Sequence, residues 1–131
     1  MKKSILMLMA SLALILAACG GGSSNPEAVA ESYMKAAFKF DYGAMKKLSA
    51  EKNKASLDKQ EAEMKSNKQA EEKKKLWAGM SVKGSETTKT SEDGNSVTVK
   101  VLTQDKDKKE SSFKVNLIKE GNAWKVDSTS K

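Results

Sequence analysis

The sequence contains no histidine, no arginine, one cysteine and one proline, and only seven of its 131 residues are aromatic. Histidine is the commonest general base and nitrogen metal ligand, so its absence removes most familiar acid–base and metal chemistry. All 24 basic residues are lysine, and without the planar arginine fork we expect no specific nucleic-acid partner. A single cysteine excludes a disulfide within the chain and a cysteine metal cluster. We therefore expect no metal site and no cofactor.

The chain also lacks an apolar run long enough to cross a membrane as a helix. Lys2 and Lys3 precede an apolar stretch at 5–16, about twelve residues against the roughly 20 that a spanning helix needs. Small residues follow at 17 and 18. This order is typical of a secretory signal peptide, so we predict that residues 1–18 are cleaved. The net charge then falls from +7 to about +5.

The one cysteine stands directly after this segment. Leu16, Ala17, Ala18 and Cys19 resemble the lipobox of bacterial lipoproteins, in which a diacylglyceryl group is attached to the cysteine. The resemblance implies lipidation of Cys19 by acyl chains such as palmitate, with the membrane as a partner. An ordinary signal peptide with an incidental cysteine is the alternative. Two or three acyl chains would anchor the protein durably, because each buried methylene adds about 0.8 kcal/mol.

The residues next to the cysteine bear on location and reach. The resemblance implies a cell-envelope protein, and Gly20 stands where aspartate usually signals inner-membrane retention, which favours the outer membrane if two membranes are present. Residues 19–24 continue as a Gly/Ser tether that spans roughly 12 Å. We expect the remaining residues, 25–131, to form a single domain.

Helices are expected in the first half of this domain. Asn25 and Pro26 form a helix start, and apolar residues recur at helical spacing after them. The expected apolar stripe contains Val29, Tyr33, Ala36, Ala37 and Phe40, and is widened by Met34 and Phe38. Asp41 is expected to cap a short second helix. A long polar third helix is predicted from 51 to about 75, mostly facing water.

Strands are expected in the second half, where the apolar period changes to two. Alternating apolar residues occupy three segments, which contain Val97, Val99 and Val101, then Phe113, Val115 and Leu117, then Trp124 and Val126. The pairs Asp93-Gly94 and Gly121-Asn122 predict hairpin turns, with a longer loop at 104–109. A two-residue turn at 121–122 pairs Leu117 with Val126. The same counting from 93–94 places Val82 on the apolar face of a four-stranded antiparallel meander.

The pattern resembles the nuclear-transport-factor-2-like (cystatin-like) superfamily and, within it, a domain-of-unknown-function family of small bacterial lipoproteins. The resemblance covers 25–127 and rests on PEAVA at 26–30, Tyr33 with Ala36, and LIKEGNAWKV at 117–126. It implies an α+β fold with N-terminal helices packed on a curved four-stranded antiparallel sheet, and in larger members a pocket between them. The long polar helix and the short sheet depart from those members, so the pocket is expected to be small or absent. No catalytic residue transfers from the family.

Few residues are candidates for a site. Asp41 beside Tyr42 could run proton-transfer chemistry at the mouth of a pocket, but capping by Asp41 and packing by Tyr42 is the favoured interpretation. The segment with Asp105 and Asp107 lacks the glycine of a calcium loop, so we expect it to be a solvated loop. Trp77 and Trp124 could stack on a ligand, although packing is the default. The candidate pocket residues are Tyr33, Phe40, Asp41, Tyr42 and Trp124.

Three functional hypotheses remain from the sequence. The main one is a non-enzymatic, lipid-anchored envelope protein that binds a partner protein or a small hydrophobic ligand at the membrane surface. The second is a pocket enzyme that uses Asp41 and Tyr42. The third is a structural or immunity-like surface protein that contacts partners through the polar helix at 51–75.

Overall fold

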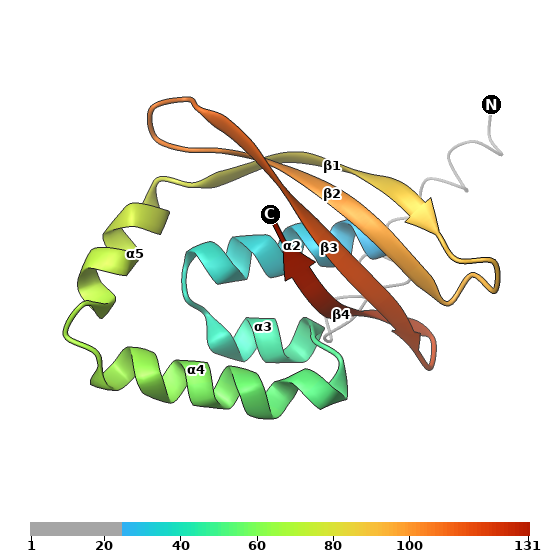
Figure 1. Ribbon diagram of the computed structural model, residues 1–131, viewed down its shortest axis with the longest axis horizontal. Coiled ribbons are helices and arrows are strands. Elements are labelled where there is room, and N and C mark those ends of the chain that lie inside the picture. The colour runs from blue at the N-terminus through green and yellow to red at the C-terminus, as the bar shows by residue number, and fades with distance from the viewer. Residues whose placement is uncertain (1–24) are drawn as a thin grey trace, which may run out of the picture.

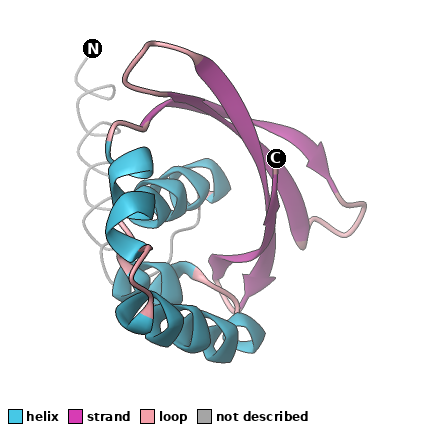
Figure 2. Ribbon diagram, turned by 60° about the vertical axis from the view of Figure 1, so that its left-hand side comes forward, coloured by secondary structure: helices cyan, strands magenta, loops and turns pink. Residues whose placement is uncertain are grey.

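The computed structural model describes residues 25–131, so the predicted signal peptide, Cys19 and the Gly/Ser tether lie outside the described residues. Within the described residues, four α-helices precede a four-stranded antiparallel sheet in the order β1-β2-β3-β4, as predicted for an α+β fold (Figure 1). The helices lie along one face of the curved sheet (Figure 2). The helix bounds are α2 Pro26–Phe38, α3 Tyr42–Leu48, the 3-10 turn η2 Glu51–Asn53, α4 Lys54–Ser66 and α5 Ala70–Ala78. The strands are β1 Ser81–Thr90, β2 Ser96–Gln104, β3 Glu110–Glu120 and β4 Ala123–Ser130.

Helix α2 begins where the sequence predicts. The Asn25 side chain accepts hydrogen bonds from the backbone N–H groups of Glu27 (3.0 Å) and Ala28 (3.2 Å), which caps the helix. The residues that pack on the sheet agree with the predicted stripe only in part, because α2 is covered on two sides. Its sheet-facing side carries Val29, Ala30, Met34 and Phe38. Ala36 instead packs in a second cluster with residues of α3 and α4, namely Tyr42, Met45 and Leu57.

The prediction of one continuous helix from 51 to about 75 is wrong. The segment consists of η2, α4 and α5, with a break at 67–69. Asn67 is extended (φ −93°, ψ 123°), and its side-chain oxygen accepts a hydrogen bond from the Gln69 backbone N–H at 2.8 Å. Asparagine ends helices in this way because its short side chain competes for backbone donors. As a result α5 turns away from α4 (Figure 1).

The hairpin formed by β3 and β4 has the predicted register. Glu120 pairs with Ala123 across the two-residue turn, and Leu117 pairs with Val126. Gly121 has a φ of +63°, which glycine adopts without strain at the first position of such a turn. The buried face of the sheet therefore holds the predicted residues, listed by burial as Val99, Val101, Val115, Leu117, Val126, Trp124 and Val97.

In the hairpin formed by β1 and β2, Val82 lies on the predicted face of the sheet, but the pairing that places it there differs from the predicted one. Gly94 lies in a four-residue loop between Ser91 and Ser96, and two irregularities follow along β1, at 87–89 and 82–84. Each irregularity places one extra residue in β1 and moves the side chains beyond it to the opposite face of the sheet. Two such residues therefore return the side chains to the predicted face. Val82 pairs with the buried Thr103 and packs against the core, although simple counting would pair it elsewhere.

The segment after α3 lies along β4, at the edge of the sheet. The Ala50 N–H donates to the Val126 carbonyl at 2.9 Å, and the Asn53 side chain donates to the carbonyls of Val126 and Asp127. These bonds occupy part of the exposed edge. They also fix α3 and the start of α4 relative to β4, which positions one wall of the site described next.

Candidate functional site

One hollow collects most of the aromatic residues in the chain. It has a volume of about 340 Å³ and lies between the helices and strands β3 and β4. Six of the seven aromatic residues line it: Tyr33, Phe38, Phe40, Tyr42, Trp77 and Phe113. The other lining residues are Met34, Ala37, Met45, Gln60 and Thr129. We call this the aromatic hollow.

Three of these rings form one contact group. The rings of Phe38 and Trp77 are stacked, with centroids 5.6 Å apart and an interplanar angle of 16°. Phe113 meets Phe38 edge-on at 6.1 Å and Trp77 at 6.3 Å. Such pairs contribute about 0.5–1.5 kcal/mol beyond the burial of their area. The group joins α2, α5 and β3, which are far apart in the sequence.

Helix α5 carries Trp77 into this group although most of the helix is exposed. Ala70 is its only buried residue, and Leu76 is 77% exposed. The helix ends at Gly79, where a Cβ atom would lie 2.8 Å from the Cβ of Lys106. Glycine is therefore needed at this position so that the β2–β3 loop can approach closely. The stacking on Phe38 and this approach hold Trp77 in place.

The polar groups of the aromatic hollow include two phenols with raised pKa values, beside Gln60 and Thr129. Burial raises the pKa of Tyr33, and a hydrogen bond with Ser49 partly offsets the rise. The pKa of Tyr42 is also raised, first by burial and then by the negative charges of Glu61 and Glu63. Both phenols are thus neutral at ordinary pH. They can donate or accept a hydrogen bond but are poor general bases.

Asp41 lies outside the lining of the hollow. Its side chain is exposed and accepts a hydrogen bond from the Ala44 backbone N–H at 3.1 Å, which caps α3. Phe40, just before it, has a φ of +55°, and the chain turns sharply between α2 and α3. Tyr42 is buried in the hollow's wall. The two residues proposed from the sequence as an acid–base pair therefore have separate local roles.

Trp124 also lies outside the hollow. It is 6% exposed within the core of the sheet, and the ammonium of Lys119 lies 5.5 Å from its ring centroid. Trp77 and Trp124 thus do not form a common stacking platform. The structure places three of the five predicted pocket residues, Tyr33, Phe40 and Tyr42, in one lining. Sequence reasoning considered Trp77 only as a stacking partner of Trp124 and missed Phe38 and Phe113 as site residues, and the scarcity of aromatics was the signal that could have indicated them.

Among residues 25–131, no three aspartate or glutamate side chains gather closely enough to hold a metal ion. The Asp105 carboxylate instead accepts hydrogen bonds from the backbone N–H groups of Asp107 and Lys109 within its loop. In the same described range, no helix has the length and apolar character required to span a membrane.

Comparison with solved structures shows the same fold in another protein. A crystal structure from Campylobacter jejuni, described as a "Putative NTF2-like transpeptidase", superposes with a TM-score of 0.53 at 20% sequence identity. The match covers 78% of this chain and 96% of that one. At this identity the similarity establishes the NTF2-like fold alone. No curated protein sequence matches the chain.

The sequence itself matches a known family over residues 17–127, which is most of the chain and includes α2 through most of β4. The chain belongs to the family described as Domain of unknown function (DUF4878).

Proposed function

We propose that this protein is a lipid-anchored, non-enzymatic envelope protein that binds a small apolar ligand in the aromatic hollow. The observation that carries the proposal is the gathering of six of seven aromatic residues around one hollow of about 340 Å³. Ligand sites of proteins are typically concave and apolar, with a few polar groups that orient the ligand. Tyr33, Tyr42 and Gln60 provide such groups.

The non-enzymatic part of the proposal is supported by the chemistry of the lining. The pKa values of the Tyr33 and Tyr42 phenols are raised, so both phenols stay protonated at ordinary pH and are not available to accept a proton as general bases. Asp41, the carboxylate considered for catalysis, is committed to capping α3. The Campylobacter jejuni protein is named a transpeptidase, but at 20% identity its name gives no catalytic residue to this chain.

The lipid anchor is supported by the sequence at 16–19 and by the position of the domain. Lipid on Cys19 would hold residue 25 close to the membrane, in the outer membrane if the cell has two. A ligand drawn from or delivered to that membrane would suit an aromatic lining. Mass spectrometry of the mature protein tests the anchor. We expect cleavage before Cys19 and added diacylglyceryl mass, and an unmodified Cys19 would contradict it.

Ligand binding is tested with N-phenyl-1-naphthylamine, a neutral apolar fluorescent probe. Two alanines on the surfaces of this region provide a matched pair: Ala37 lines the aromatic hollow, whereas Ala78 lines a separate groove outside it. Ala37→Leu would add three carbon atoms to the lining of the hollow and narrow it, while keeping a good helix former in α2. We expect saturable probe binding that Ala37→Leu weakens and Ala78→Leu leaves intact. Binding that is absent, or equally strong in Ala37→Leu, would refute the proposal.

A further inference from the structure

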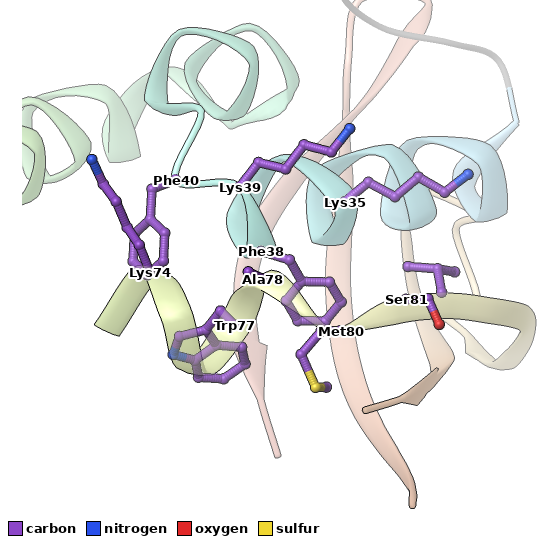
Figure 3. A pocket seen from close by; sticks show the side chains of 10 residues that line it. Lys35, Phe38, Lys39, Phe40, Lys74, Trp77, Ala78, Met80 and Ser81 are labelled. Atoms are coloured by element: carbon purple, nitrogen blue, oxygen red, sulfur yellow. The ribbon is translucent and has the colours of Figure 1, made fainter. Parts of the chain in front are cut away.

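A second concavity lies on the other side of the ring wall formed by Phe38, Phe40 and Trp77. Its volume is also about 340 Å³, and its floor is mostly apolar. Figure 3 shows the side chains of Phe38, Trp77 and Met80 near one another, while Lys35 and Lys39 at the end of α2 and Lys74 of α5 extend away from them. We call it the lysine groove. Its lining consists of Lys35, Phe38, Lys39, Phe40, Lys74, Trp77, Ala78, Met80, Ser81 and Val82.

The charge of this groove is one-sided. Lys35, Lys39 and Lys74 belong to its lining, and the described residues that line it include no aspartate or glutamate. Lys35 lies in the last turn of α2 and Lys39 follows four residues later as the C-cap, so two like charges are placed close together at this end of the helix. An anion bound between them would remove this repulsion.

The neighbouring acids leave these charges largely uncompensated. Within the described part of the chain, Lys35 and Lys39 take part in no ion pair. Lys74 approaches Glu71 only at 3.9 Å, and both side chains are well exposed to water. Exposed pairs of this kind contribute little. Three lysine side chains thus line a mostly apolar groove, which is the complement of a molecule with an anionic head and an apolar chain.

We propose that the lysine groove binds a membrane lipid with an anionic phosphate headgroup, with the head at the lysines and part of an acyl chain over Phe38, Trp77 and Met80. Lysine is a common phosphate ligand because its ammonium acts as a compact charge. The site lies within reach of a membrane, since α2 begins soon after Cys19 and is about 20 Å long. With α2 along the surface, its lysine end meets the headgroups.

This inference rests on the attachment to a membrane in the proposed function, so the test separates the two. The full chain is reconstituted into phosphatidylcholine vesicles that contain either brominated phosphatidic acid or the same fraction of brominated phosphatidylcholine. Co-flotation reports attachment. Bromine on the acyl chains quenches only tryptophans that they contact, and Trp77→Phe identifies the share of quenching that belongs to Trp77.

We expect the fluorescence of Trp77 to be quenched about fivefold more by brominated phosphatidic acid than by brominated phosphatidylcholine. About fivefold is the gain in affinity that one lysine contributes near an anionic surface. Replacing Lys35, Lys39 and Lys74 by glutamine should remove this preference. A control with the same loss of charge replaces Lys59, Lys100 and Lys114, which do not line the groove, and should keep it.

Three results would overturn the inference in chains that co-float. Equal quenching by the two lipids would show that the groove does not select a phosphate headgroup. If replacing either set of three lysines lowered the preference for phosphatidic acid equally, the preference would depend on the net charge of the protein and not on the groove. Full displacement of the lipid by millimolar inorganic phosphate would identify a site for free phosphate. Chains that fail to co-float would instead contradict membrane attachment.

Discussion

Phe38 is the residue whose removal should change both the stability and the shape of the site. Its ring is 5% exposed, stacks on Trp77 and meets Phe113 edge-on. It also lines both the aromatic hollow and the lysine groove. Phe38→Ala removes the ring that separates the two spaces and the main aromatic contact of α5.

The expected cost is large for a domain of this size. Replacing a buried phenylalanine with alanine destabilises proteins by about 3–5 kcal/mol, which includes the cavity left behind. Typical domains have about 5–15 kcal/mol in total, so the variant should lose about a fifth of its stability or more. Phe38→Leu keeps most of the apolar volume and loses mainly the ring contacts, for which we expect about 1–1.5 kcal/mol.

Urea denaturation followed by circular dichroism measures these losses, and hydrogen exchange reports on α5. We expect the amides of α5 to exchange faster in Phe38→Ala than those of α2, because α5 has few other buried contacts. Leu102→Ala is the control: Leu102 lies on the outer face of the sheet, 42% exposed, and should cost less than about 1 kcal/mol. A loss below about 1 kcal/mol in Phe38→Ala, or unchanged exchange in α5, would refute this account of the ring wall.

Three further predictions concern polar groups. Asp41→Ala should lower the free energy of unfolding by about 1 kcal/mol through loss of the α3 cap, and Asp41→Asn should restore most of it; equal losses in thermal or urea unfolding would contradict the capping role. The pKa values of both tyrosines are raised, so the tyrosinate absorbance of the folded chain should appear above the usual pH of about 10. The contribution of these two phenols to stability is therefore fully present below pH of about 10 and declines above it. Titration of the folded and unfolded chains at the same pH would refute this. Hydrogen bonds from the Ser91 hydroxyl and the Asn95 N–H lower the pKa of Asp93. The Asp93 carboxylate therefore stabilises the fold above pH of about 3.9, and this contribution is lost as the pH falls. Ser91→Ala should raise the pKa of Asp93 in an NMR titration, and an unchanged pKa would contradict the expectation.

Local patterns in the sequence predicted the elements that depend on neighbours in the chain. The Asn25 and Asp41 caps, and the Gly121-Asn122 turn with its register, follow from side-chain chemistry and counting over a few residues. The break at Asn67 was missed because charged residues continue at helical spacing on both sides of it. The two irregularities in β1 were missed because polar residues at 83–90 carry no alternation that would reveal a shift.

The aromatic hollow was harder to predict than the fold. Its rings come from α2, the turn after it, α3, α5 and β3, and no spacing in the sequence connects them. Tyr33, Phe40 and Tyr42 were identified because they lie close together in the chain. Trp77 joins them only because the break at Asn67 redirects α5, which the prediction of one long helix could not include.

The central claim is that the aromatic hollow is a binding site, and NMR of the aromatic rings tests it most directly. Naphthalene, as a neutral probe, should produce saturable chemical-shift changes at Tyr33, Tyr42 and Phe113, while Trp124 in the sheet core remains unchanged. Shifts that are absent, that do not saturate, or that include Trp124 to the same extent would contradict the claim.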